Sequence, residues 1–216
     1  MSARMLVIAK APVPGRVKTR LGADVGMEVA AEVAAASLLD TLEACAEAVG
    51  PDHCHVALAG DLADAVRGDE LRAALEGWHV TPQRGDGLGE RLAAAHADVA
   101  GPRVQVGMDT PQVTAPLLRD VATGLDTHDA VLGRAVDGGW WVLALRDAAP
   151  ARVLPHVPMS SEETHDATLA ALRGEALTVG DTVELRDVDH VADADAVAAD
   201  APDSHFARCW SGVVVR

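Results

Sequence analysis

The stretch MLVIAKAPVPGRVKTRL, residues 5–21, decides how the rest of the chain is interpreted. It opens with an uninterrupted apolar run, which is typical of a buried strand. The part that follows holds two prolines and one glycine, and it carries Lys10, Arg16, Lys18 and Arg20 without an acidic residue. Because proline fixes φ and removes a backbone donor, this part should be stiff. We therefore predict a strand that ends in a rigid, positively charged loop.

That positive loop contrasts with an acidic chain of 216 residues and formal net charge -15. Such a balance argues against nucleic-acid binding and against docking on anionic membranes, since both need basic surface. No apolar run approaches the roughly 20 residues of a membrane span, and no signal peptide is recognisable. The three cysteines have no paired spacing, which is typical of reduced thiols. We therefore expect a cytoplasmic protein with no nucleic-acid partner and no membrane span.

Strand and helix patterns alternate along the chain, which predicts the α/β class with a mostly parallel central sheet flanked by helices. Extended segments are predicted at residues 5–9, 54–60, 78–83, 103–109, 129–146 (two strands and a turn) and 176–189. Helices are predicted at 26–49, within 61–75, from about 88, at 114–125 with Thr114 as N-cap, at 160–172 with a serine cap, and at 191–202.

Two acidic segments are candidates for metal binding. Asp109 ends the predicted strand 103–109 and is followed directly by Thr and Pro. Ligands gather at the carboxyl ends of parallel strands, and Mg²⁺ or Mn²⁺ there takes oxygen ligands and bridges to phosphates. Asp187 and Asp189 would share one face of an extended segment and could supply a second ligand. Taken alone, the first segment is more typical of a turn, and the second of a helix cap.

Two glycine-rich segments are candidates for ligand contact. QRGDGLGERL, residues 83–92, opens a predicted helix, whose free N–H groups can receive a base, a sugar or a phosphate. VDGGWWVLAL, residues 136–145, combines an acid, two glycines and two tryptophans that should point to opposite faces of a strand. The chain has no zinc-ligand spacing and no GxSxG motif, so zinc and serine-hydrolase chemistry are not indicated.

In this order, AKAPVPGRVKTRL, QRGDGLGERL, GMDTP, DGGWWVLAL and RDVDHVADAD resemble the DUF2064 family of bacterial proteins, which are provisionally assigned as glycosyltransferases. That family is similar to the GT-A superfamily of nucleotide-diphospho-sugar transferases. The resemblance covers about residues 4–200. It implies one GT-A-like domain over residues 1–200, with a tail, 201–216, that packs on the same domain.

The resemblance also implies residue roles. The nucleotide and phosphate loop would comprise Lys10, Ala11, Pro12, Gly15, Arg16, Lys18 and Arg20, with Gly85, Leu88, Gly89 and Arg91 near the base or ribose. Asp109 would bind Mg²⁺ or Mn²⁺ with Asp189 as second ligand. Asp109 and Asp137 are the candidate catalytic residues, and Asp137 and Glu162 are the candidates for a general base. Gly138, Gly139 and Trp140 would shape the acceptor or sugar side. The family often has Tyr at position 140, Thr at position 190 and a Trp-Ser pair where this chain has MSSEET, so the acceptor is not identified.

Three functions remain open on this evidence. The first is glycosyl transfer from a nucleotide-sugar to a small acceptor, and it is preferred. The second is nucleotidyl transfer from an NTP to a phosphorylated acceptor, with release of pyrophosphate. The third is a non-catalytic nucleotide-binding relative. A homodimer is compatible with the sequence. All three functions require the basic loop and Asp109 to face one pocket.

Overall fold

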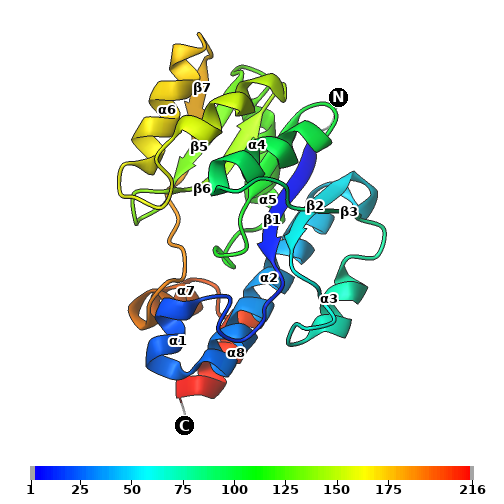
Figure 1. Cartoon of the computed structure of the whole chain (residues 1–216), viewed down its shortest axis with the longest axis vertical. Helices are drawn as coiled ribbons and strands as arrows, with labels where there is room; N and C mark the ends of the chain where they lie inside the picture. Colours follow the sequence, from blue (N-terminus) through cyan, green and yellow to red (C-terminus); the bar gives the residue numbers. More distant parts are fainter. Residues whose placement is uncertain (1–2, 215–216) are drawn as a thin grey trace.

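The computed structural model describes residues 3–214 and shows one α/β domain around a seven-stranded sheet (Figure 1). The strand order is β3-β2-β1-β4-β6-β5-β7, and only β6 runs antiparallel to its neighbours. The predicted α/β class with a mostly parallel sheet is confirmed. The strands are β1 (Arg4–Lys10), β2 (Cys54–Ala59), β3 (His79–Pro82), β4 (Arg103–Val106), β5 (Ala130–Arg134), β6 (Trp140–Leu145) and β7 (Val179–Asp181).

The strand β1 lies between β2 and β4 near the middle of the sheet. Its residues Met5, Leu6 and Val7 are fully buried, so both faces of the strand are covered. A continuous apolar run is what a parallel strand covered on both faces requires. The central position of β1 brings the loop that follows Lys10 to the middle of the sheet's carboxyl edge.

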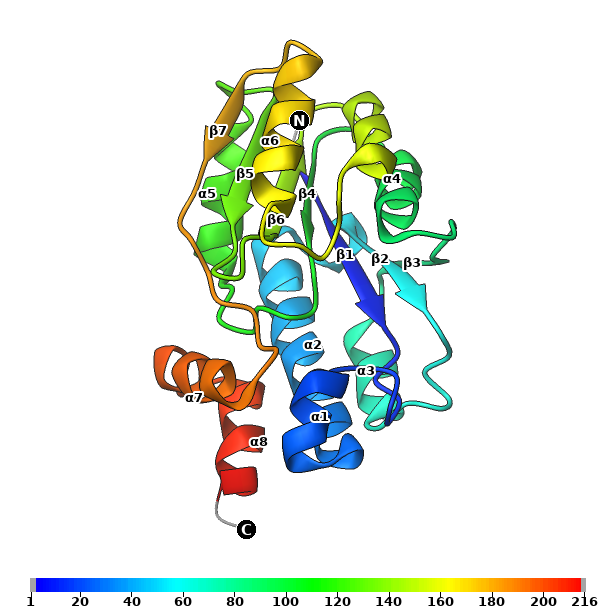
Figure 2. The same cartoon turned by 60° about the vertical axis from the view of Figure 1, so that its left-hand side comes forward.

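Helices cover both faces of the sheet (Figures 1 and 2). One core cluster joins α2 and α5 to one face, and others join α4, the 3-10 helix η2 and α6 to the opposite face. The helices are α1 (Thr19–Val25), α2 (Met27–Val49), α3 (Gly68–Ala74), α4 (Leu88–Asp98), α5 (Ala115–Gly124), α6 (Thr164–Gly174), α7 (Val191–Asp200) and α8 (His205–Val214), with 3-10 helices η1 (Pro51–His53) and η2 (Ala149–His156).

The helices α1, α7 and α8 lie together beyond the end of β1 where its loop begins (Figures 1 and 2). They share an apolar cluster with α2, in which Phe206 is fully buried. Both carboxylate oxygens of Asp40 on α2 accept hydrogen bonds from the first backbone N–H groups of α8, at His205 and Phe206, each at 2.8 Å. Asp40 thus caps α8 and fastens the described part of the tail to the domain.

One local prediction is wrong. The helix α6 begins at Thr164 rather than at a serine cap, because Ser160 takes a left-handed conformation (φ 59) and the chain turns before the helix. The segment 176–189, predicted to be extended, contributes β7 to the sheet and one further bridge at Leu185. Beyond that bridge, Val188 N–H donates a hydrogen bond to Asp109 O at 3.0 Å.

Among residues 3–214, no helix has both the length and the hydropathy that a bilayer crossing demands. The cysteines Cys45, Cys54 and Cys209 are all free thiols.

Candidate active site

The loop after β1 is held rigidly by backbone contacts. Ala11 N–H donates to Ala59 O of β2 at 2.8 Å, and Pro12 O accepts from Val66 N–H at 3.1 Å. Gly15 has φ +75, a conformation that glycine adopts without steric cost, and it lets the loop turn back toward the sheet. Lys18 follows with φ 45 and ψ 42 and precedes α1. The loop therefore delivers its last cations to a fixed place beside the sheet edge.

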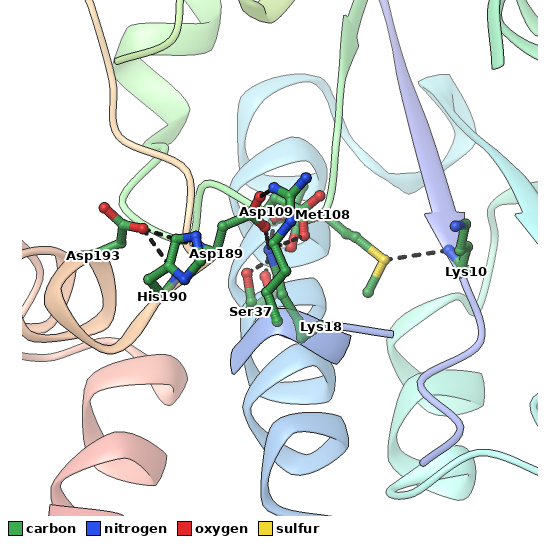
Figure 3. Close-up of polar contacts among 10 residues, drawn as sticks. Lys10, Lys18, Ser37, Met108, Asp109, Asp189, His190 and Asp193 are labelled. Carbon is green, nitrogen blue, oxygen red and sulfur yellow. Dashed lines mark hydrogen bonds and ion pairs between the residues drawn. The ribbon is translucent and has the colours of Figure 1, made fainter. Parts of the chain in front are cut away.

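Lys18 contacts two carboxylates that the sequence analysis singled out (Figure 3). Its Nζ lies 2.5 Å from Asp109 Oδ1 and 3.4 Å from Asp189 Oδ1. Arg20 Nη1 donates to Asp189 Oδ2 at 2.7 Å. The Lys18 side chain is 5% exposed, whereas that of Asp109 is 49% exposed. The buried ammonium is thus compensated by two carboxylates that remain open to solvent.

The contact with Asp109 requires the turn after β4 to be positioned accurately. Ser37 Oγ on α2 donates to Met108 O at 2.6 Å, and Lys10 N–H contacts Met108 Sδ at 3.2 Å (Figure 3). The hydrogen bond from Val188 N–H to Asp109 O joins this turn to the segment that carries Asp187 and Asp189. Residues from three distant parts of the sequence therefore meet at the carboxyl edge of β1 and β4.

The buried Lys18 ammonium is surrounded by the carboxylates of Asp109, Asp187 and Asp189, and this arrangement shifts the pKa values of the lysine and of Asp187. Burial opposes the charge of Lys18, but attraction to Asp109, Asp189 and Asp187 prevails, and the pKa of Lys18 rises above its usual 10.5. Burial, followed by repulsion from Asp137 and Asp189, raises the pKa of Asp187 to about 6. The carboxylates near Lys18 therefore lie close enough to influence one another and the lysine.

A cavity of about 870 Å³ lies in front of these residues. Of the residues predicted for the site, those that line it are Lys10, Arg16, Lys18, Arg20, Leu88, Arg91, Asp109, Asp137, Gly139, Trp140 and Asp189. A second cavity, about 600 Å³, lies between η2 and α6 and is lined mainly by apolar side chains with the Arg152–Glu175 ion pair. Many more charged side chains line the first cavity than the second, so we take the first cavity as the candidate site.

Six residues that were predicted for the site do not line the cavity: Ala11, Pro12, Gly15, Gly85, Gly89 and Gly138. At two of them, Gly89 and Gly138, the packing leaves no room for a side chain. A Cβ on Gly89 would lie 2.2 Å from Leu154 O, so Gly89 lets α4 pack against η2. Gly138 has φ +90, and a Cβ there would lie 2.2 Å from Glu162 O. The turn before β6 is thus pressed against the segment that precedes α6.

The turn at 136–139 also contributes to the cavity wall, through Asp137 and Gly139. Asp137 Oδ1 accepts a hydrogen bond from Gly139 N–H at 2.7 Å, which fixes the carboxylate within its own turn. Trp140 Nε1 donates to Thr168 Oγ1 at 3.2 Å, and Trp141 Nε1 donates to Val183 O at 2.9 Å. The two indoles belong to different core clusters, so they do lie on opposite faces of β6, as predicted.

Sequence reasoning gave no role to two glutamines that line the cavity. Gln83 Nε2 donates to Ala9 O at 2.8 Å and to Ala57 O at 3.0 Å, which ties together the ends of β1 and β2. Gln105 on β4 is 2% exposed, and its Oε1 has no hydrogen-bond partner. The signal that could have identified Gln105 was an uncharged polar residue between two valines of a predicted buried strand. Met159, Ser160 and Ser161 also line the cavity.

The donor set fits a hard divalent cation, because Asp109, Asp187 and Asp189 offer carboxylate oxygens in one cavity. Lys18 Nζ, however, already lies between Asp109 and Asp189. Within residues 3–214, three metal-ligating groups lie within 4.8 Å of one another only at Asp40, Glu43 and His205. Contacts within the protein explain why these three side chains lie together. Asp40 caps α8, and His205 Nε2 lies 2.9 Å from Glu43 Oε1.

The family model described as "Uncharacterized protein conserved in bacteria (DUF2064)" matches residues 41–161. The fold is similar to that of a provisionally assigned nucleotide-diphospho-sugar transferase from Desulfovibrio desulfuricans, at 27% identity and TM-score 0.80, over 96% of this chain and 91% of that chain. No curated protein matches the chain significantly.

Two further solved structures, both below 25% identity, show the fold alone. Rv0371c from Mycobacterium tuberculosis, in complex with manganese, is 20% identical at TM-score 0.53, over 91% of this chain and 98% of that chain. A cytidylyltransferase from Leptospira borgpetersenii is 13% identical at TM-score 0.58, over 99% of this chain and 94% of that chain.

Proposed function

We propose, from the premise that this chain belongs to the DUF2064 family, that it is a metal-dependent transferase that uses a nucleotide-activated donor. The reaction that we propose is glycosyl transfer from a nucleotide-sugar to a small acceptor. The similarity to a provisionally assigned nucleotide-diphospho-sugar transferase over 96% of the chain supports this choice.

The observation that carries the proposal is the contact between Lys18 and Asp109 inside the cavity. Two motifs far apart in the sequence predicted Lys18 as a phosphate-binding residue and Asp109 as a metal ligand. A phosphate chain needs both a cationic donor and a metal-holding acid within a few ångströms, and this pair meets that requirement.

In this proposal the basic loop binds the diphosphate of the donor. Lys10, Arg16 and Arg20 line the same cavity as Lys18, and their donors can contact several phosphate oxygens. Local positive charge matters here because the net charge of the chain repels a polyanion. Asp109 and Asp189 would hold Mg²⁺ or Mn²⁺, which when bound neutralises charge on the phosphates and on the leaving group.

The acceptor would enter beside the turn at 136–139. Asp137 and Glu162 line this side of the cavity and are the candidates for a general base. One carboxylate oxygen of Asp137 is held by Gly139 N–H, so the other is directed by a fixed turn. Trp140 would offer a flat apolar surface to the sugar or the acceptor.

Nucleotidyl transfer is the second candidate, and the number of cations favours it. Five basic side chains line the cavity, namely Lys10, Arg16, Lys18, Arg20 and Arg91. A triphosphate carries more negative charge than the diphosphate of a nucleotide-sugar, so it would use more of them. In this reaction the acceptor attacks the α-phosphate and pyrophosphate leaves.

Mass spectrometry of reaction products separates the candidates. The protein is incubated with Mn²⁺ and either a panel of nucleotide-sugars or a panel of NTPs, each with small hydroxyl and phosphorylated acceptors. A glycosylated acceptor with release of nucleoside diphosphate supports the proposal, and pyrophosphate release from NTPs supports the second candidate. Nucleotide binding without any product would identify a non-catalytic relative. Asp109→Asn should abolish turnover, whereas Asp120→Asn on the exposed side of α5 should not.

The cytoplasmic location and the homodimer stay predictions. Analytical ultracentrifugation of the purified protein tests the homodimer directly.

A further inference from the structure

Lys18 occupies the place that the proposed function assigns to a metal ion. Its Nζ lies between Asp109 Oδ1 and Asp189 Oδ1, at 2.5 Å and 3.4 Å (Figure 3). The side chain is almost fully buried there, while both carboxylates remain partly exposed. An ammonium that contacts two carboxylates satisfies the same charges that a divalent cation would satisfy.

The backbone of Lys18 shows that this placement is imposed by its surroundings. Lys18 has a left-handed conformation (φ 45) that residues with a side chain rarely adopt. Its carbonyl accepts from Gly22 N–H at 2.8 Å in the first turn of α1, which fixes the backbone. Strained residues of this kind concentrate where a side chain has a functional task. The chain therefore presents the Lys18 ammonium to Asp109 from a fixed backbone position.

We propose that Lys18 and a divalent cation exclude each other at Asp109 and Asp189. In the free protein the ammonium keeps the two carboxylates paired, and the metal binds weakly. When a phosphate chain enters the cavity, Lys18 exchanges its carboxylate partners for phosphate oxygens, and the carboxylates become available to the metal. This inference rests on the proposed function, since it assigns an order of binding to the same site.

The exchange is physically reasonable for lysine. Its ammonium is a compact point charge on a flexible stem with three donors, so it can transfer from carboxylate to phosphate by rotation of the side chain. Two cations that contact the same carboxylate oxygen repel each other strongly in a partly buried site. In the structure Arg20 Nη1 donates to Asp189 Oδ2 at 2.7 Å, so Asp189 keeps one cationic partner when Lys18 leaves.

The first experiment measures Mn²⁺ binding to the free protein by titration calorimetry. Lys18→Met removes the ammonium and keeps the length of the side chain, and we expect it to bind Mn²⁺ about tenfold more tightly than the wild type, or better. Lys10→Met is the matched control, because it removes one positive charge from the same cavity without touching either carboxylate, and its effect should be at most a few-fold. The double variant Lys18→Met/Asp109→Asn should lose the increase in Mn²⁺ affinity that Lys18→Met shows.

The second experiment uses the wild type and so does not depend on how a variant folds. Lys10 and Lys18 are the only lysines of the chain, so an amine-reactive label followed by peptide mass spectrometry reports on each separately. Lys18 should label slowly in the free protein and faster as Mn²⁺ is added, with the same midpoint as the calorimetric titration. Lys10 serves as the internal control and should change little.

Two results would overturn the inference. One is a folded Lys18→Met variant that binds Mn²⁺ no more tightly than the wild type or Lys10→Met. The other is a Lys18 reactivity that Mn²⁺ leaves unchanged at every concentration the protein tolerates. Both are independent of the product assay: tighter Mn²⁺ binding without any product would reject the proposed function alone, and product formation with unchanged Mn²⁺ binding would reject the exchange alone.

Discussion

Lys18 Nζ and Asp109 Oδ1 are 2.5 Å apart, although one follows β1 and the other follows β4. The two strands pair in parallel, with Val7 opposite Val106, so their carboxyl ends leave the sheet side by side. The loop after β1 turns back, and the short turn after β4 meets it. This pair joins the predicted phosphate loop to the predicted metal acid, and the first two predictions test its two members.

Lys18→Ala should weaken the binding of phosphate-bearing ligands by about 1.5–3 kcal/mol, because a charge-assisted hydrogen bond is lost. Calorimetry with inorganic pyrophosphate measures this without knowledge of the base. Arg173→Ala, in the last turn of α6 and remote from the cavity, should leave the affinity unchanged. Equal affinities for wild type and Lys18→Ala would remove Lys18 from the phosphate site.

Asp109→Asn should abolish the part of nucleotide binding that depends on Mn²⁺, since a neutral amide oxygen replaces a charged carboxylate ligand. Stability should also fall, by about 1–3 kcal/mol, because the substitution removes one of the two carboxylates that compensate the buried Lys18 ammonium, while Asp189 remains. A thermal-shift series with and without Mn²⁺ measures both effects. Nucleotide binding by Asp109→Asn that still responds to Mn²⁺ as the wild type does would contradict the metal role.

Gly89→Ala should destabilise the protein by about 1–3 kcal/mol, because the new Cβ would lie 2.2 Å from Leu154 O and force α4 away from η2. Gly212→Ala in α8 is the matched control, since no atom lies within 4 Å of its Cβ position. The control should stabilise the helix slightly, by about 0.5–1 kcal/mol. Urea unfolding compares the two. Weaker pyrophosphate binding by a Gly89→Ala variant of unchanged stability would instead point to ligand contact.

The buried His96 should make stability fall at acidic pH. Burial, then the positive charge of Arg103, lowers the pKa of His96 to about 3 from 6.5. The folded protein keeps His96 neutral, whereas the unfolded chain gains a proton below pH 6.5, so the contribution to stability is complete above 6.5. It then declines by about 1.4 kcal/mol per pH unit toward the folded pKa.

Urea unfolding over this pH range measures the slope for the wild type and for His96→Gln, which does not titrate. The variant should have a shallower slope, and the difference isolates His96 from the other titrating groups. Identical slopes for the wild type and His96→Gln would contradict the prediction.

Hydrophobic periodicity and capping residues predicted most helices and strands correctly, because both depend on interactions between residues that are close in sequence. The apolar run at 5–9 became the buried central strand β1, and Thr114 accepts the predicted capping hydrogen bond from Leu117 N–H, at 3.4 Å. The serine cap of α6 failed because Ser160 has a left-handed backbone, and capping signals alone do not reveal that conformation. The hydrogen bond from Val188 N–H to Asp109 O could not be predicted, because the two residues are remote in sequence.

The sequence by itself determined the fold class, the rigid cationic loop and the acids that follow the strands, because periodicity, proline stiffness and charge act within a few residues. Only the tertiary structure decided which acids meet the loop. It placed Lys18 between Asp109 and Asp189, buried Gln105 in the cavity wall and made Gly89 a packing residue. Those outcomes depend on strand order and on contacts between distant segments, and the spacing of residues along the chain does not encode such distances.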